Sequence, residues 1–478
     1  MAKTGGKLIR ALALAALCLL LGGCATNIST DRLYALPRLP AEYASLETEI
    51  NALLSTGAEH AAPTSGSNLQ SVQMVDLDGD GVEEAVAFFR KATDQKPMKI
   101  YFFKSNGSSY EQMALIEGTA GSLYSIAYYD LDGDGQREIL VGFKSGTEVQ
   151  MLSVYALRGS EPLNLLTTAY LRYTVSDLDG NGRQELTVFY SGEENRCMVD
   201  CYTWDDRELS CISTLELSFS APELSRVTAG ALSDGKQALY VTGVADNSVA
   251  VYDILTVKNG VLRNVAPDTA SSASDSGFRF LSLYPADIDS SGVVEIPEPV
   301  PFPLLDEDGE VYYRILWHDY DSAGNSTVVR RTFHNTADGW SLILPEAWDE
   351  WVSLLRGGTP EESSVLFFRR DGNGQTQPFL EICALTGSGR EERAQRGDRF
   401  LLARQVETVY TAELLPCGDW AGAVDEDAVK ASFSLIRRRM DDGRKLRKEL
   451  CRDEKSVGFR GRVQHSQLYR HQSDPRRL

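Results

Sequence analysis

The chain has 478 residues, a formal net charge of −20 and 42% apolar residues. A chain of this length exceeds what one hydrophobic core usually serves, so we expect two or three domains. The negative charge argues against nucleic acid and anionic membrane surfaces as binding partners, because both repel an acidic protein.

Residues 1–23 have the pattern of an export signal. Lys3, Lys7 and Arg10 precede an apolar run over 11–21 that is too short to span a bilayer. The following Leu-Gly-Gly-Cys resembles the end of a bacterial lipoprotein signal. This resemblance implies that Cys24 becomes a lipid-modified N-terminus that anchors the protein outside the bacterial cell membrane. An ordinary signal peptide with an incidental cysteine is the alternative.

Residues 24–68 predict a spacer followed by an amphipathic helix. The segment 25–40 is polar and contains proline. Over 40–58 apolar side chains such as Leu46, Ile50 and Leu53 recur every three or four residues, which is the period of a helix with one buried face. The polar run 61–68 then indicates a linker or a turn.

Four nine-residue stretches are near-copies of one another: 76–84, 130–138, 177–185 and 287–295. Each has an oxygen-bearing side chain at positions one, three and five, Gly at six and Glu at nine. A loop that turns at the glycine can aim these oxygens at one point, which suits Ca²⁺ with its preference for 6–8 oxygen ligands. Turns of Asp and Gly without a metal are the alternative.

Strand-like runs follow each acidic loop, for example 85–89, 139–143 and 186–190. A degenerate copy at 230–238 keeps only Asp234 as an acid in its loop, and we expect it to bind no ion. Counting it, copies start at 76, 130, 177, 230 and 287, roughly fifty residues apart, the repeat length of a β-propeller with one four-stranded blade per copy. We therefore predict a mainly β protein whose residues 69–335 form a β-propeller-like domain of about five repeat units.

The loops resemble the FG-GAP or VCBS-type repeats of integrin α-subunit propellers and of bacterial surface proteins. By position, this resemblance implies that Ca²⁺ is held by the side chains at one, three, five and nine and by the backbone carbonyl at seven. The implied ligands are Asp76, Asp78, Asp80, Val82 and Glu84; Asp130, Asp132, Asp134, Gln136 and Glu138; Asp177, Asp179, Asn181, Arg183 and Glu185; and Asp287, Asp289, Ser291, Val293 and Glu295. Because Asn181 and Ser291 replace an acid, we expect the third and fifth loops to bind more weakly than the first two.

Two cysteines are candidates for a disulfide bond. The stretch 196–214 predicts a hairpin that turns near Asp205 and sets Cys201 opposite Cys211, where two thiols can be close enough to bond. Free thiols are the alternative.

Beyond the last acidic loop the pattern changes. Residues 336–436 contain further strand-like runs and a helix-like stretch over 425–436, which predicts a small α+β domain. The run 371–378 lacks acids at its third and ninth places and predicts a plain hairpin turn. Residues 437–478 hold 14 basic and six acidic residues without apolar periodicity, so we expect a disordered tail or, alternatively, an anomalous end of the reading frame.

No catalytic motif stands out in the sequence. The five histidines have neither metal-site nor triad spacing, and Trp317, Trp340, Trp348 and Trp351 fit core positions better than a sugar-stacking surface. The sequence therefore favours a lipid-anchored, calcium-stabilised module that binds or scaffolds a surface protein or glycan. A cell-envelope hydrolase acting on glycan or peptide, with its site in the propeller channel or C-terminal domain, is the alternative. A third possibility is an envelope assembly factor whose helix docks a partner.

Overall fold

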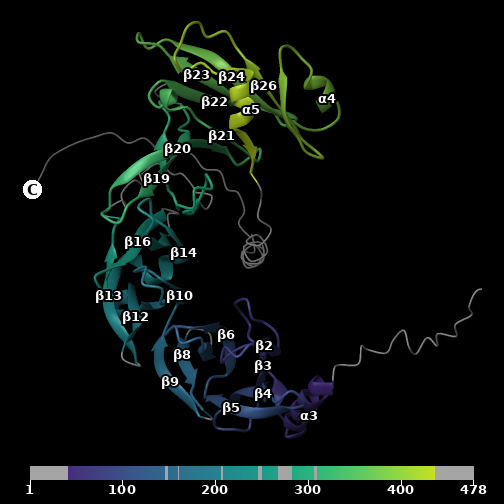
Figure 1. The fold of residues 1–478 in the computed structure, drawn as a ribbon. Coiled ribbons are helices and arrows are strands. Elements are labelled where there is room, and N and C mark those ends of the chain that lie inside the picture. Colours follow the sequence, from purple (N-terminus) through teal and green to yellow (C-terminus); the bar gives the residue numbers. More distant parts are fainter. Residues whose placement is uncertain are drawn as a thin grey trace, which may run out of the picture. The chain divides into compact units, whose positions relative to one another are not determined.

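The computed structural model describes residues 41–145, 149–159, 161–205, 208–245, 250–266, 283–305 and 309–436. The chain divides after residue 270 into two compact units (Figure 1). The predicted signal over 1–23, Cys24 and the tail 437–478 lie outside the described residues. Across the described segments, no helix has the length and apolar character needed to cross a membrane.

The N-terminal unit starts with a helix that lies against its first sheet. Helix α3 spans Ala41–Ser55, inside the range expected from the sequence. Its residue Leu46 is buried in a cluster with Ala85, Ala87 and Phe89, and Ile50 packs against the same cluster. The apolar stripe of the helix is therefore used for packing within the unit.

Four antiparallel sheets follow, each made of strands that are consecutive in the sequence. In the first, β1 and β2 both pair with β3, and its strands are β1 (Glu59–His60), β2 (Val72–Val75), β3 (Glu84–Arg90), β4 (Met98–Ser105) and β5 (Tyr110–Gly118). The second contains β6 (Ser122–Tyr129), β7 (Glu138–Ser145), β8 (Val149–Leu157) and β9 (Pro162–Ala169). The third contains β10 (Arg172–Ser176), β11 (Glu185–Ser191), β12 (Arg196–Asp205) and β13 (Glu208–Ser220). The fourth contains β14 (Leu224–Ala231), β15 (Gln237–Val244), β16 (Ala250–Lys258) and β17 (Val261–Asn264), and short 3₁₀ helices lie at Glu193–Asn195 and Ala221–Glu223.

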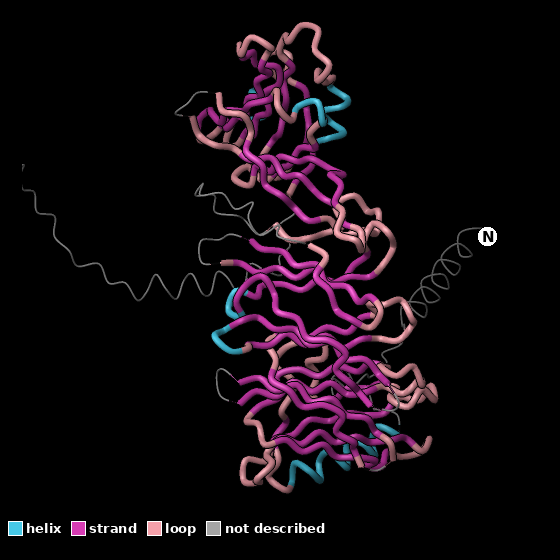
Figure 2. Tube along the Cα trace, turned by 90° about the vertical axis from the view of Figure 1, so that its left-hand side faces the viewer, coloured by secondary structure: helices cyan, strands magenta, loops and turns pink. Residues whose placement is uncertain are grey.

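Neighbouring sheets of this unit share apolar cores, and Figure 2 shows their strands as successive layers. On one face of β3, Val86 and Phe88 join a cluster with Ile126 and Val141 of the second sheet. Further clusters connect the second sheet with the third and the third with the fourth. Strands buried on both faces have near-continuous apolar sequences, as the runs after the acidic loops do. One antiparallel sheet per repeat is therefore confirmed in this unit, whereas closure of the sheets into a ring stays a prediction.

The C-terminal unit contains two five-stranded sheets. The fifth sheet has the order β18 (Ile296–Pro301), β19 (Tyr313–Tyr320), β20 (Ser326–Asn335), β21 (Trp340–Ile343) and β27 (Phe433–Leu435). The sixth has the order β22 (Val352–Thr359), β23 (Glu362–Arg370), β24 (Thr376–Leu385), β26 (Val409–Leu414) and β25 (Phe400–Arg404). A 3₁₀ helix at Glu346–Trp348 and the short helices α4 (Arg390–Arg393) and α5 (Glu426–Ser432) accompany them. The two sheets share one core that buries Trp340 and Trp348, whereas Trp351 is 45% exposed.

The structure moves the predicted boundary between the repeat domain and the C-terminal domain. Asn335 of β20 pairs with Trp340 of β21, and Trp340 also pairs with Leu435 of β27, so a boundary after residue 335 would cut through the fifth sheet. The helix expected over 425–436 ends at Ser432, because the next three residues extend this sheet as β27. The fifth acidic loop therefore belongs to the C-terminal unit.

The predicted cysteine pairing is wrong because the hairpin of β12 and β13 has a different register. Cys201 lies opposite Ser213, Cys211 lies opposite Tyr202, and a bulge separates the two pairs. Cys201 is fully buried while Cys211 is exposed, since neighbouring strand positions face opposite sides of a sheet. All five cysteines among the described residues are free thiols.

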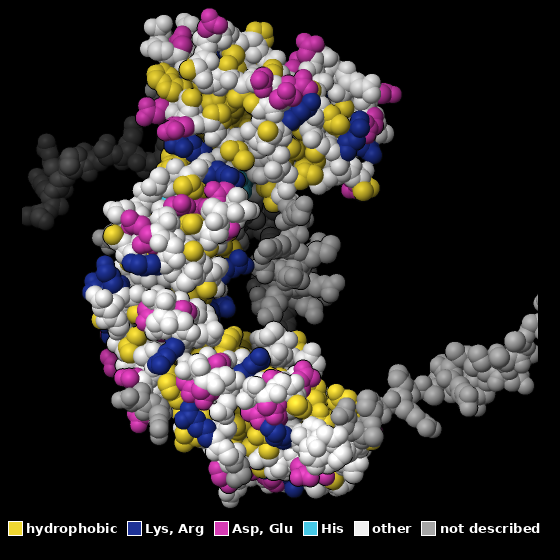
Figure 3. All heavy atoms as spheres, in the orientation of Figure 1, with side chains coloured by type: hydrophobic (Ala, Val, Ile, Leu, Met, Phe, Trp, Pro, Cys, Tyr) yellow, Lys and Arg dark blue, Asp and Glu magenta, His cyan; other side chains and the backbone are white. Residues whose placement is uncertain are grey.

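Charged side chains of both signs mix on the surface. Figure 3 shows Asp and Glu interspersed with Lys and Arg on the visible face of the N-terminal unit. Arg196, for example, contacts Glu216 at 3.0 Å, and both side chains are exposed. The acidic loops differ from such surface pairs because several acids converge within each of them.

Candidate metal centres

Each of the four acidic loops leads into a strand of a sheet. The residues on either side of the loop pair in the same way in all four cases. The residue before the loop pairs with the glutamate at position nine: Val75 with Glu84, Tyr129 with Glu138, Ser176 with Glu185, and Ala286 with Glu295. In the fifth loop this pair is an isolated bridge before β18. Equivalent register makes the four loops directly comparable.

Backbone groups of each loop fold around the aspartate at position one. In the second loop the N–H of Gly133 donates to Asp130 Oδ1 at 2.7 Å, and the N–H of Gly135 donates to Asp130 Oδ2 at 3.0 Å. Both glycines have positive φ, 76° and 88°, which glycine adopts without steric cost. The fifth loop has Ser290 at position four with φ 63°, a strained conformation for a serine.

Three carboxylates converge in every loop. Oxygens from positions one, three and nine all lie within 4.8 Å of one another in the sets Asp76, Asp78 and Glu84; Asp130, Asp132 and Glu138; Asp177, Asp179 and Glu185; and Asp287, Asp289 and Glu295. Among the described residues, groups of three or more potential metal-binding side chains occur at these four loops. Twelve of the expected ligands are thus brought together.

The side chain at position five has another partner. Asp80 Oδ1 accepts the N–H of Val82 at 2.8 Å, and Asp134 Oδ1 accepts the N–H of Gln136 at 2.7 Å. Asn181 and Ser291 receive the corresponding N–H groups at 2.7 and 3.2 Å. One oxygen at position five therefore stabilises the turn. Its role as a ligand, like that of the carbonyls of Val82, Gln136, Arg183 and Val293, stays a prediction.

The glutamate at position nine is the most informative group. Glu84, Glu185 and Glu295 are 0–1% exposed, and in each Oε2 accepts the N–H of position two at 2.7–2.9 Å. Oε1 of each is buried without a hydrogen-bond partner in the described part of the chain. A buried carboxylate oxygen without a partner is costly, and a cation at the cluster would remove that cost.

Burial also changes the acidity of these groups. It raises the pKa of Glu138, Glu185 and Glu295 to about 7, and the neighbouring aspartate charges add to this rise. The pKa of Glu84 is raised for the same reason. A positive charge at the cluster would favour the ionised form of these buried acids. The donor set and the orphaned oxygens fit a hard divalent cation such as Ca²⁺.

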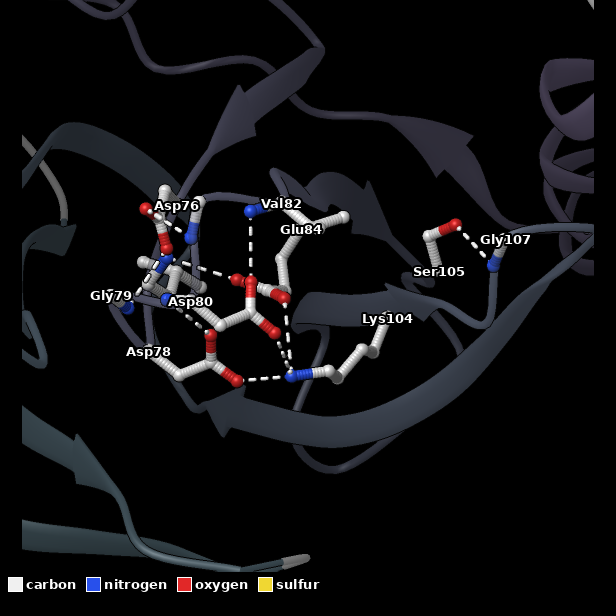
Figure 4. Close-up of polar contacts among 11 residues, drawn as sticks. Asp76, Asp78, Gly79, Asp80, Val82, Glu84, Lys104, Ser105 and Gly107 are labelled. Atoms are coloured by element: carbon white, nitrogen blue, oxygen red, sulfur yellow. Dashed lines mark hydrogen bonds and ion pairs between the residues drawn. The ribbon is translucent and has the colours of Figure 1, made fainter.

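The first loop already contains a positive charge. Lys104, on β4, directs its ammonium group at the acids of this loop (Figure 4). Its Nζ contacts Asp78, lies 3.0 Å from Asp80 Oδ2 and lies 3.8 Å from Glu84 Oε1. The hydrogen bonds to Asp78 and Asp80 raise the pKa of Lys104, so it stays charged. The sequence of the nine-residue motif does not predict the presence of Lys104.

The second loop is approached from its side by an arginine. Arg158 Nη2 donates to Asp132 Oδ2 at 2.8 Å, and the Arg158 guanidinium lies 5.2 Å from the centre of the Trp204 ring on the third sheet. A cavity of about 20 Å³ lies beside this loop, lined by Asp134, Gln136 and Glu138 among others. A cavity of this size holds about one water-sized occupant.

The first two loops also contact one another through their backbones. The N–H of Arg137 in the second loop donates to the carbonyl of Leu77 in the first at 2.8 Å. A Cβ on Gly79 would lie 2.5 Å from the carbonyl oxygen of Gly135. Glycine at position four of the first loop therefore permits a close approach between repeats.

The degenerate fourth copy forms a shorter hairpin. Ala231 pairs directly with Gln237, and the N–H of Leu232 donates to the carbonyl of Lys236 at 2.7 Å. Leu232 is fully buried, like the leucine at position two of the second loop, Leu131. This copy therefore keeps the buried leucine, while a tight turn takes the place of the acidic segment.

Comparison with known proteins identifies part of this repeat. Residues 76–141, from the first acidic loop through the second, match the family of FG-GAP-like repeats. This segment is an FG-GAP-like repeat. It accounts for a small part of the chain, and no curated protein matches the sequence.

Solved structures resemble the chain only distantly. The rhamnogalacturonan lyase PL11 of Bacillus licheniformis is 12% identical with a TM-score of 0.27, over 72% of this chain and 71% of that one. The periplasmic gluconolactonase of Pseudomonas aeruginosa is 13% identical with a TM-score of 0.26, over 68% of this chain and 95% of that one. Similarity at this level carries no functional argument, so the function is inferred from the loops.

Proposed function

We propose that this protein is a calcium-stabilised β-sheet repeat module that binds or scaffolds a ligand outside the cell, anchored through lipid on Cys24. The observation that carries the proposal is the buried glutamate of the acidic loops, whose Oε1 lacks a hydrogen-bond partner in three of the four among the described residues. A repeated orphaned acid beside two further carboxylates is the chemistry of a cation site.

The proposed role of the cation is structural. Three of the loops join two paired strands, β2 to β3, β6 to β7 and β10 to β11. The fifth loop is closed by the isolated bridge of Ala286 with Glu295. Neutralising the converging carboxylates would stabilise that junction, because like charges this close repel one another. Repetition of the same centre also favours a structural role, since an enzyme needs one special site.

The calcium proposal is tested by thermal melting of the purified chain during calcium titration. Binding to the folded state alone raises stability, so the melting temperature should rise with Ca²⁺ and fall again with a chelator. Asp130→Ala should remove much of the rise contributed by its loop. Asp371→Ala is the matched control, because Asp371 also accepts two turn N–H groups, from Asn373 and Gln375, at a hairpin where its acid stands alone. Equal melting curves with calcium and with chelator would contradict the proposal.

A cleft in the C-terminal unit favours a glycan among the proposed ligands. It measures about 390 Å³, and its lining includes Trp351, Trp420, Arg369 and Arg370. An exposed indole can stack on a sugar ring, and guanidinium groups recognise carboxylates. Glycan pull-down from envelope extracts with the wild-type chain and Trp351→Ala tests this choice; equal capture by both would point to a protein ligand or another surface.

A further inference from the structure

Each acidic loop is followed by a strand, and that strand pairs with the next strand of the sheet. The same pairing position on this next strand places a side chain beside the loop in all four cases. In the first sheet Ala85 pairs with Phe103, and Lys104 lies one step further along, toward Glu84. The corresponding pairs are Ile139 with Tyr155, Leu186 with Tyr202, and Ile296 with His318. The residues one step beyond these pairs are Ala156, Thr203 and Asp319. At this one position the four loops thus have a cation, a methyl group, a hydroxyl and an acid. Arg158, two residues beyond Ala156, donates to Asp132 of the second loop, and within the described residues it forms no ion pair with the buried Glu138.

Lys104 contacts two of the three converging acids that would hold a metal ion in the first loop. Its ammonium contacts Asp78 and approaches Glu84 Oε1 to 3.8 Å, and both acids belong to the set whose oxygens converge within 4.8 Å. Its third partner is Asp80 Oδ2 at 3.0 Å, the oxygen left free by the turn hydrogen bond of Oδ1. Figure 4 shows the ammonium reaching these acids from the neighbouring strand.

A metal ion and this ammonium cannot share the same oxygens. Both are positive, and two such charges at contact distance repel, most strongly where water is excluded. Glu84 is fully buried, and the Lys104 side chain is 39% exposed, so calcium could enter only if Lys104 moved out into solvent. Breaking three carboxylate contacts opposes that movement.

We propose that Lys104 is the built-in cation of the first loop, which therefore folds without Ca²⁺, whereas the second, third and fifth loops bind it. This inference rests on the proposed calcium function and departs from the order given by counting acids. The first and second loops each offer four carboxylates, yet only the first does not need a metal ion.

The test counts calcium ions bound per molecule of the full chain by equilibrium dialysis with metal analysis, at about 1 mM free Ca²⁺, a concentration at which extracellular sites fill. The wild type should bind three ions and Lys104→Gln four, because the neutral amide frees the first loop. Lys104→Arg keeps the charge and should stay at three.

A reciprocal variant makes the same comparison in the opposite direction. Thr203 is half-buried and occupies the position of Lys104 beside the third loop. Thr203→Lys should reduce the count from three to two. Circular dichroism of each variant verifies folding, and if Thr203→Lys fails to fold, Lys104→Gln against Lys104→Arg decides alone.

The outcomes separate this inference from the function on which it rests. Four ions in wild type and in Lys104→Gln, or three in both, would overturn the role of Lys104 while calcium binding stands. No bound ion in the wild type but one in Lys104→Gln would support Lys104 and refute calcium binding by the other loops. No bound ion in either protein would overturn both proposals.

Discussion

The first and third acidic loops have the same backbone arrangement, but the neighbouring strand presents a positive side chain to the first and a neutral one to the third. Both bring three carboxylates within 4.8 Å and bury the glutamate at position nine. The first has a fourth acid, Asp80, yet meets the ammonium of Lys104, whereas the third has Asn181 and the neutral Thr203 in the corresponding places. The neighbouring strand thus completes the charge of the first loop, so we expect calcium affinity to depend on that strand as well as on the acids within the motif.

The largest expected effect comes from neutralising the buried glutamate of the third loop, with the same change in the first loop as the comparison. Glu185→Gln should remove the calcium response of the third loop, while Glu84→Gln should leave the calcium response unchanged. A site filled at one hundred times its Kd adds about 2.7 kcal/mol, and 1 kcal/mol moves the melting temperature of a unit of 150–250 residues by about 2–4 °C. We therefore expect the calcium-dependent rise in melting temperature to shrink by about 5–10 °C in Glu185→Gln. Equal losses in the two variants would remove the distinction between the loops.

A second pair of variants sharpens the role of contact between repeats. Gly79 and Gly133 both occupy position four with positive φ, so alanine costs roughly 1–2 kcal/mol of backbone strain at either. A Cβ at Gly79 also meets the carbonyl oxygen of Gly135 at 2.5 Å, whereas a Cβ at Gly133 meets open space. Gly79→Ala should therefore lower the free energy of unfolding more than Gly133→Ala, as measured by urea denaturation. Equal losses of unfolding free energy would show that the close contact between the first and second loops contributes little to stability.

The pH dependence of stability tests the buried glutamates without a metal. Burial raises the pKa of Glu138, Glu185 and Glu295 to about 7, above the value of an exposed glutamate, about 4.3. The folded state then holds these protons more tightly than the unfolded state, so their contribution to stability is present at low pH and is lost as pH rises from about 4.5 to about 7.

In chelator, Glu185→Gln should therefore gain stability relative to wild type between pH 5.5 and 7.5, because the amide cannot ionise. With saturating Ca²⁺ the wild type should keep its stability over the same range, since the ion compensates the ionised carboxylate. Melting curves of both proteins at several pH values measure the difference. A wild-type curve parallel to that of Glu185→Gln in chelator would contradict the raised pKa.

The smallest expected effect concerns the fifth loop, where the register position of Lys104 carries Asp319. Asp319 Oδ1 is buried without a hydrogen-bond partner among the described residues. Burial raises the pKa of Asp319, and the charge of Asp289 adds to this rise. Asp319→Asn removes a negative charge beside the site and should weaken calcium binding there several-fold, as seen by isothermal titration. Unchanged affinity would confine the influence of this position to the first loop.

Much of the architecture follows from sequence alone. The spacing of acids and glycines within nine residues determined the loop conformation, because the hydrogen bond from the glycine at position six to the aspartate at position one is local and recurs in all four loops. The apolar runs behind the loops determined the strands that begin at Glu84, Glu138 and Glu185. Convergence of positions one, three and nine followed from the same short segment.

What lies next to these segments depends on how distant strands pair. The strand register differs by one residue from the predicted one, so Cys211 lies opposite Tyr202 rather than Cys201. Because successive side chains of a strand point to opposite faces, this difference keeps the two thiols apart. Pairing of β20, β21 and β27 placed the fifth repeat in the C-terminal unit. Lys104 reaches Glu84 from twenty positions away through strand pairing that no local pattern specifies, so the charge balance of each loop is a property of the fold.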